Sequence, residues 1–431
     1  MIRRALLAWL LALALGAAAG AAGAAEAPAG QDLVERVISG EVVSVGDGVA
    51  WVSISFTSGL RPGMAVEFLR GGSPVGTGKA KAPQFERFVV EVAPPAKLKV
   101  GDAVRVKLLE PRPPGYVPKV EKPPEATLRG PDGELLYPRS QAEISAALAK
   151  LRPAEAGGAL YAETPSAAGE LKAGKLSPGA LSAALAHLKA YRYLAGVPYE
   201  DVALKDQYNS ESQHAAVLLA ILKRLDHTPK RPEGVPEDFF KVAYQGTSHS
   251  NLAQGPKGLS LAVDMWMFDS DPSNIDRLGH RRWCINPTML NTGFGTFGGF
   301  SAIWALDTAR KPAPDFDYIP YPVRGYHPVG YFGPAWAWCV SLNPARYAKP
   351  DRAAVKAAIY PLDSQLKRAE KPLELNYENI NTTGFGVPIC IIFRPKAATV
   401  SPGSRYQVEI EGLKRKNGSE AKIQYLVEFC P

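Results

Sequence analysis

The amino-acid sequence predicts a multidomain α+β protein, with helices in the middle of the chain and strands on either side. Its 431 residues exceed what one hydrophobic core usually serves, which favours about two to four domains. Short β-branched runs between glycine-centred turns occupy residues 35–109, and helical spacing of apolar residues dominates from 139 to 268. Spaced strands return after residue 312.

The first 25 residues are typical of a secretory signal peptide. Arg3 and Arg4 precede an apolar run at residues 5–15, and small residues follow up to Ala25. This run is shorter than the about 20 apolar residues of a spanning helix, and no later segment reaches that length. We therefore expect cleavage and an exported protein, periplasmic or extracellular, without a transmembrane span. An uncleaved anchor is the alternative.

Residues 35–109 are expected to form a small β-barrel. Two runs rich in valine, 42–45 and 49–54, flank a glycine-containing turn at 46–48, which predicts a hairpin. About five such strands make a small barrel. The segment contains no catalytic constellation, so we interpret it as an accessory structural or docking domain.

A proline-rich linker and a central domain follow. Residues 110–124 contain six prolines, which stiffen the backbone and predict an extended linker. The central domain is expected over residues 135–310, with a lead-in helix at 139–152.

Three further helices are predicted in the central domain. Ser177 and Pro178 are typical of a helix start, and Gly196 of its end. A second helix is expected at 206–225 and a third at 259–268. The residues expected to face inward on the second helix are Ala215, Leu218, Leu219, Leu222 and Leu225.

Strands are expected in the remainder of the chain. Glycine-rich turns at residues 291–306 separate two strands of the central domain. From residue 311 to 431, spaced strands without long helices favour a C-terminal β-sandwich.

Five phrases occur in a fixed order in the central domain. They are 185–196 (LAHLKAYRYLAG), 225–229 (LDHTP), 248–255 (SHSNLAQG), 262–269 (AVDMWMFD) and 279–287 (GHRRWCINP). Over residues 177–308 they resemble the CAP superfamily of cysteine-rich secretory, antigen 5 and pathogenesis-related proteins, in its bacterial form. The resemblance implies an α-β-α sandwich for the central domain.

The resemblance also implies a cleft lined by two histidines and two acidic residues. His227 and His280 match the two histidines. Ser250 stands where one acid is expected, between His249 and Asn251. One of the implied acids is therefore absent from its position.

Some members of the family take up a divalent metal in this cleft. Asp269, three residues after Trp266, best matches the second acid. Together with His227 and His280 it would supply just enough ligands for a zinc ion, and His249 is a further possible nitrogen ligand. A packed histidine that donates to a backbone carbonyl is the alternative for each imidazole.

Three functions fit these observations. The first is a non-catalytic binding or interaction role at the cleft, for a small or lipid-like ligand or an extracellular partner. The second is a hydrolase, either metal-assisted or using Ser250 as the nucleophile. The third is a structural envelope protein. Arg281 and Arg282 would make the cleft rim cationic if they face it, and a surface turn is the alternative.

Charge and cysteine content argue against a nucleic-acid-binding protein and against a metal finger. Cleavage after residue 25 lowers the net charge from +8 to +6, and the basic residues are scattered, so nucleic-acid binding is unsupported. The four cysteines lack the paired spacing of metal fingers. They permit two disulfides in any of three connectivities, and buried thiols are equally compatible.

Overall fold

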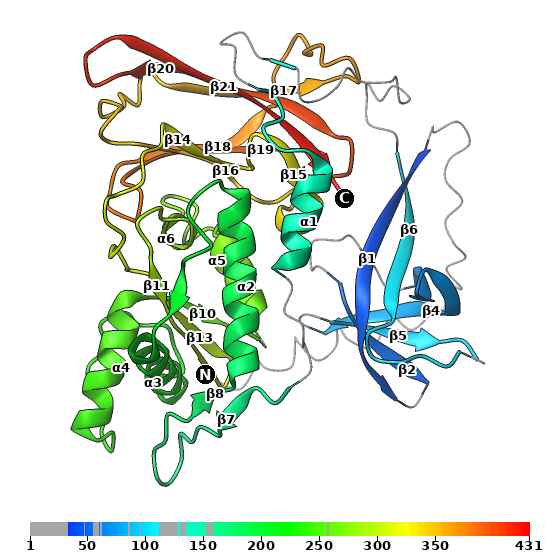
Figure 1. Ribbon diagram of the computed structural model, residues 1–431, viewed down its shortest axis with the longest axis vertical. Helices are drawn as coiled ribbons and strands as arrows, with labels where there is room; N and C mark the ends of the chain where they lie inside the picture. Colours follow the sequence, from blue (N-terminus) through cyan, green and yellow to red (C-terminus); the bar gives the residue numbers. More distant parts are fainter. Residues whose placement is uncertain are drawn as a thin grey trace, which may run out of the picture.

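The computed structural model describes residues 33–46, 48–54, 60, 63–84, 87–94, 96–111, 128–129, 135–151, 158–256 and 258–431 (Figure 1). The predicted signal peptide lies outside the described residues, and so does the predicted linker apart from residues 110 and 111.

The N-terminal part is a six-stranded antiparallel sheet. Its strands are β1 (Leu33–Gly46), β2 (Val49–Ser53), β3 (Ala65–Arg70), β4 (Ser73–Gln84), β5 (Arg87–Val92) and β6 (Ala103–Pro111). The order β1-β2-β5-β4-β3-β6 closes on itself, because β1 pairs with both β2 and β6. The predicted hairpin is confirmed: Gly46 of β1 pairs with Val49 of β2.

This sheet has a core of its own. Alternate residues of each strand face inward, as period-two patterning requires, and Val52, Phe68 and Val106 are fully buried. Their cluster contains no residue from the rest of the chain. The N-terminal sheet is therefore stabilised separately from the part that carries the candidate site.

Six helices occur in the described central part. They are α1 (Gln141–Lys150), α2 (Pro178–Leu194), α3 (Asp206–Leu222), α4 (Glu237–His249), α5 (Leu259–Phe268) and α6 (Gly279–Cys284). The predicted start of α2 is confirmed, because the Ser177 side chain caps the helix and Pro178 is its first residue. The predicted bounds of α5 are also confirmed.

The end of α3 differs from the prediction. The helix stops at Leu222 because Lys223 adopts a left-handed conformation, with φ of 54°. Leu225, which was expected to face inward, is 44% exposed. The residues after Lys223 instead form the loop that carries His227.

Helix α4 was not predicted, and it packs closely on α3. A β-carbon at Gly246 would lie 1.9 Å from the backbone oxygen of Glu211, so only glycine allows this approach. The helix ends at His249, and β10 begins at the next residue. This junction places Ser250 and Asn251 at the start of a buried strand.

A three-stranded antiparallel sheet lies at the centre of this part. It consists of β10 (Ser250–Gln254), β13 (Phe300–Trp304) and β12 (Phe294–Phe297), in that order. Leu252 packs in a cluster with α3, whereas the next residue, Ala253, belongs to the cluster that contains α2 and α5. Helices therefore cover both faces of the sheet.

Two small strand pairs complete the central part. Strands β7 (Tyr161–Glu163) and β8 (Lys175–Leu176) pair antiparallel, whereas β9 (Ala203–Leu204) and β11 (Asn291–Thr292) pair parallel.

The C-terminal part contains two four-stranded sheets. One has the order β14 (Tyr318–Tyr321), β16 (Trp338–Leu342), β19 (Ile389–Pro395) and β18 (Leu375–Asn381). The other has the order β15 (Gly325–Pro328), β21 (Glu420–Cys430), β20 (Arg405–Lys414) and β17 (Lys356–Leu362). A short 3-10 helix, η2 (Val329–Tyr331), follows β15.

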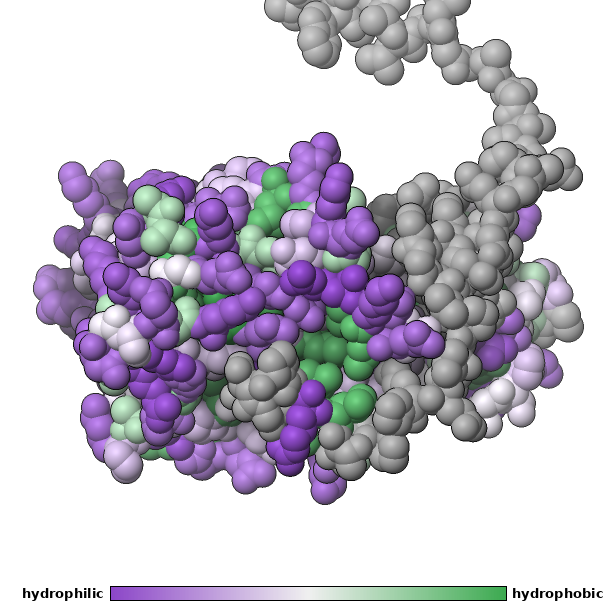
Figure 2. Space-filling view, turned by 90° about the horizontal axis from the view of Figure 1, so that it is seen from above, coloured by the Kyte–Doolittle hydropathy of each residue, from purple (hydrophilic) through white to green (hydrophobic). Residues whose placement is uncertain are grey.

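The central and C-terminal parts share one hydrophobic core. A single cluster of buried residues extends from Tyr137 to Cys430 and includes both α5 and the two C-terminal sheets. The face in Figure 2 is mostly hydrophilic, with hydrophobic residues in small groups. All four cysteines are buried free thiols. No helix in the described part of the chain has the length and hydropathy that crossing a membrane requires.

Candidate functional site

A pocket of about 260 Å³ brings together four of the six site residues that the sequence suggested. It lies where the α4–β10 junction meets α6 and the loop between β18 and β19. Its lining residues are His227, Ser248, Ser250, Asn251, Arg277, Gly279, His280, Trp283, Leu306 and Phe385. His227, His280, Ser250 and Asn251 thus share one cavity, although they come from three different segments.

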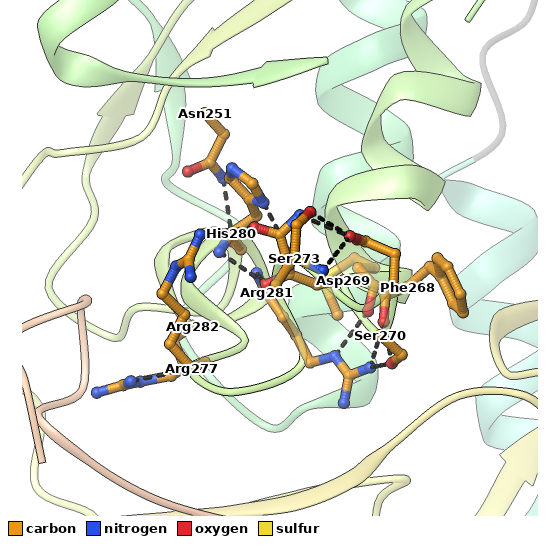
Figure 3. A network of polar contacts seen from close by, with 12 residues as sticks. Asn251, Phe268, Asp269, Ser270, Ser273, Arg277, His280, Arg281 and Arg282 are labelled. Carbon is orange, nitrogen blue, oxygen red and sulfur yellow. Dashed lines mark hydrogen bonds and ion pairs between the residues drawn. The ribbon is translucent and has the colours of Figure 1, made fainter. Parts of the chain in front are cut away.

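Asp269 fixes the orientation of the His280 ring. Its Oδ1 lies 2.7 Å from His280 Nδ1, and its Oδ2 accepts hydrogen bonds from the backbone N–H groups of His280 and Arg281, at 2.9 and 3.2 Å (Figure 3). The Asp269 side chain is only 1% exposed. It occupies the left-handed position that ends α5, with φ of 42°, and this turn aims its carboxylate at the start of α6.

Asn251 connects the first turn of α6 to the central sheet. Its amide Nδ2 donates to the backbone oxygen of His280 at 3.0 Å and contacts Cys284 Sγ at 3.4 Å. Asn251 is 2% exposed. The position of His280 is therefore set from two sides, by a buried carboxylate and by a buried amide.

His227 has an equally defined ring orientation, although it is an exposed residue. Its Nδ1 lies 2.9 Å from the backbone oxygen of Thr247, which can only accept, so Nδ1 carries the proton. The Asp226 side chain accepts from the backbone N–H of Thr228 and stabilises the turn that presents the ring. Within the described residues, neither His227 Nε2 nor His280 Nε2 has a hydrogen-bond partner.

Ser250 also lines the pocket. The residue is 2% exposed, and its Oγ is itself buried, with no hydrogen-bond partner among the described residues. Its backbone pairs with Trp304 in the sheet, which fixes the position of the residue. A buried hydroxyl without a partner costs about 1 to 3 kcal/mol.

His249 was also suggested for the cleft, but it is not among the residues that line this pocket. Its ring stacks on Trp304 with centroids 4.7 Å apart and an interplanar angle of 2°. Tyr208 stacks on the same indole, at 4.2 Å. Because His249 is the last residue of α4, its side chain belongs to the helix surface, whereas the next side chain belongs to the sheet.

Arg281 and Arg282 lie neither at a cleft rim nor on a surface turn, because both are fully buried. Arg281 donates to the backbone oxygens of Met267 and Ala337, each at 2.6 Å. Arg282 donates to the backbone oxygen of Val387 from two of its nitrogens. The two guanidinium groups therefore attach α6 to the C-terminal part.

The rest of the pocket lining was not predicted. It includes Arg277, Leu306 and two aromatic residues, Trp283 and Phe385. A β-carbon on Gly279 would lie 2.9 Å from Phe385 Cδ1, so the ring packs directly on the glycine backbone. No local signal in the sequence connects Phe385 with α6.

The three possible metal ligands that the sequence suggested, His227, His280 and Asp269, do not form a ligand group among the described residues. Both oxygens of Asp269 are used by N–H groups of His280 and Arg281, so this carboxylate does not face the pocket as a ligand. In the described part of the chain no three His, Cys, Asp or Glu residues converge as metal ligands do. Two imidazoles alone fall short of the three protein ligands of a catalytic zinc site.

A second polar cluster lies outside the pocket. His187 Nε2 is 2.7 Å from Asp264 Oδ1, and the Tyr191 hydroxyl donates to the same oxygen at 2.6 Å. Burial lowers the pKa of His187, but the Asp264 carboxylate outweighs it and raises the pKa above its usual value. The cluster connects α2 with α5.

Comparison with protein-family models gives no match, and comparison with curated proteins finds no significant relative. The family resemblance therefore depends on the phrases quoted above.

Proposed function

We propose that this is an exported CAP-like protein that binds a small ligand in the pocket of His227 and His280 without catalysing a reaction. On this proposal the central part is the CAP-like α-β-α sandwich, and the N-terminal and C-terminal sheets are the expected β-barrel and β-sandwich. Export depends on the signal-like residues 1–25.

One observation carries the proposal. Each imidazole has its Nδ1 bonded to a fixed acceptor, which directs the lone pair of the neutral ring to Nε2. Both rings line the same cavity, and neither Nε2 is satisfied within the described residues. Converging, pre-oriented polar groups with no partner are what a ligand site needs.

The size of the pocket and its two imidazoles favour a small polar ligand over a lipid. The volume of about 260 Å³ is below the roughly 300 to 1,000 Å³ of sites for drug-sized molecules. An acyl chain would cover the two imidazole Nε2 atoms without offering them a partner, which is unfavourable.

Ligand-observed NMR on the full chain tests this proposal. A panel of sugars, amino acids, amines, nucleosides and organic acids is screened against the wild type and against a double variant, His227→Phe with His280→Phe. This change keeps two rings but removes their nitrogens. We expect at least one compound to bind the wild type and the control His214→Gln, but not the double variant. Identical behaviour of all three proteins would overturn the proposal.

The Asp269–His280 pair favours a second candidate, hydrolysis with His280 as the general base. A carboxylate that bonds Nδ1 leaves Nε2 as the basic atom facing the pocket, which is the arrangement that general-base catalysis uses. Release of p-nitrophenol from p-nitrophenyl acetate tests it. Turnover that is lost in His280→Gln but kept in His214→Gln would replace the non-catalytic proposal with this one.

A further inference from the structure

The pocket combines hydrogen-bond acceptors with an aromatic wall, and this combination restricts the ligand that the proposed function requires. When their rings are neutral, His227 and His280 present lone pairs at Nε2, which accept hydrogen bonds but cannot donate them. A ligand with several O–H groups can donate to both of them.

Charge argues against the two ionic classes of ligand. None of the ten lining residues in the described part of the chain is Asp or Glu, so an ammonium ligand would find no carboxylate. An anion would face the two Nε2 lone pairs. The single guanidinium in the lining, Arg277, already donates to Asp276 at 2.9 Å and to Asn274 at 3.0 Å. The lining is therefore best matched by a neutral ligand.

Phe385 gives the pocket an aromatic surface that is held by several contacts. Phe385 packs on Gly279, which has no side chain to separate the ring from the backbone. The guanidinium of Arg282 lies 5.4 Å from the centroid of the same ring, and this arginine is itself held by backbone oxygens of the Phe385 loop. A preformed aromatic surface stabilises a ligand that has a flat apolar face.

Size sets the last restriction. A water molecule occupies about 30 Å³ in the liquid, and atoms joined by covalent bonds each occupy somewhat less. A volume of about 260 Å³ therefore accommodates a ligand of roughly a dozen non-hydrogen atoms. A six-membered sugar ring with its hydroxyl groups is of this size. It also has hydroxyl groups along its edge and C–H groups on its faces.

We propose that the pocket binds one sugar unit, with its hydroxyl groups donating to His227 and His280 Nε2 and one C–H face packed against Phe385. This inference depends on the proposed binding function. The unit can be a free monosaccharide or the end of a glycan chain, because both present the same ring.

Saturation-transfer NMR with the full chain tests the assignment, using glucose, N-acetylglucosamine and chitotriose as probes. We expect at least one of them to bind the wild type and to lose about tenfold or more in affinity in Phe385→Ala. Phe385→Leu keeps an apolar side chain but removes the flat ring, and we expect a similar loss. Phe239→Ala, on α4 and outside the pocket lining, is the matched control and should bind as the wild type does.

The results of this experiment distinguish failure of the sugar assignment from failure of the proposed binding function. Binding of chitotriose as well as the monosaccharides identifies a glycan end, whereas binding of the monosaccharides alone identifies a free sugar. If no sugar binds but an organic acid, an amine or another class of the panel binds in a histidine-dependent way, the sugar assignment is overturned and the binding function remains. If nothing in the panel binds, both fall. Sugar binding unaffected by either Phe385 variant would overturn the assignment to this pocket.

Discussion

The Asp269 carboxylate contacts His280 at two atoms, with Oδ1 2.7 Å from the ring Nδ1 and Oδ2 2.9 Å from the backbone nitrogen. One buried side chain thus sets both the rotation of the ring and the start of α6. The consequence is that the stability of this region and the orientation of the site depend on the same carboxylate.

Replacing Asp269 with Asn should lower stability and weaken ligand binding together. The amide would direct N–H groups at the donors that now bond to the carboxylate, and we expect a loss of about 2 to 3 kcal/mol in the free energy of unfolding. Urea unfolding followed by tryptophan fluorescence measures it. Asp271→Asn, two residues away and capping an exposed turn, should change stability by less than about 0.5 kcal/mol. Equal effects of the two substitutions would contradict this account.

Removing the buried guanidinium of Arg281 should be one of the most damaging changes in the chain. In the variant Arg281→Met, the backbone oxygens of Met267, Phe268 and Ala337 lose their donors. We expect this loss to lower the free energy of unfolding by about 3 to 5 kcal/mol. Arg281→Lys restores some of these bonds and should fall between Met and the wild type. Arg224→Met removes an arginine that is 60% exposed and serves as the control for thermal unfolding. Wild-type stability of Arg281→Met would show that these bonds do not hold α6 in place.

The His187–Asp264 pair should make stability depend on pH. The folded pKa of His187 is raised, because Asp264 outweighs the effect of burial. Protonation therefore stabilises the fold below the unfolded pKa of about 6.5, and this contribution is lost as pH rises through the folded value. The stability difference between wild type and His187→Gln should be largest near pH 5.5 and smallest near pH 8.5. Urea unfolding across that range checks the sign, and a difference that grows with pH would be the opposite of what we expect.

The four cysteines should all titrate as thiols once the protein unfolds. Burial raises the pKa of Cys284 to about 12, and Cys430 has the same value for the same reason. A hydrogen bond from Cys390 and the charge of Arg281 lower the pKa of Cys339, but this thiol is only 1% exposed. Ellman's reagent should detect no thiol in the native protein and four in urea without reductant. Two thiols in urea would reveal a disulfide.

Several elements of the fold were predictable from local patterns. The serine cap and proline of α2, the bounds of α5 and the hairpin at Gly46 all depend on residues close in the chain. The grouping of His227, His280, Ser250 and Asn251 has a different origin, because the four residues are distant in the chain and their meeting was expected only from the family resemblance.

Distant contacts explain what the sequence did not reveal. Arg281 and Arg282 were expected near solvent, but their acceptors lie 56 and 105 residues further along the chain. Phe385 reaches the pocket over a similar separation, through a glycine whose missing side chain makes room. Helix α4 was missed although its own residues are strongly amphipathic and begin with two acidic residues, Glu237 and Asp238.

The protonation of the two pocket histidines is the most direct measure of the central claim. In ¹⁵N-labelled protein at about pH 8, where free imidazole is neutral, two-bond ¹H–¹⁵N spectra distinguish the protonated ring nitrogen from the bare one. Signals are assigned with His227→Phe and His280→Phe. Both rings should carry the proton on Nδ1 and have a bare Nε2. A proton on Nε2 of either ring would contradict this claim, because the pocket would then lack the paired acceptors on which the ligand site depends.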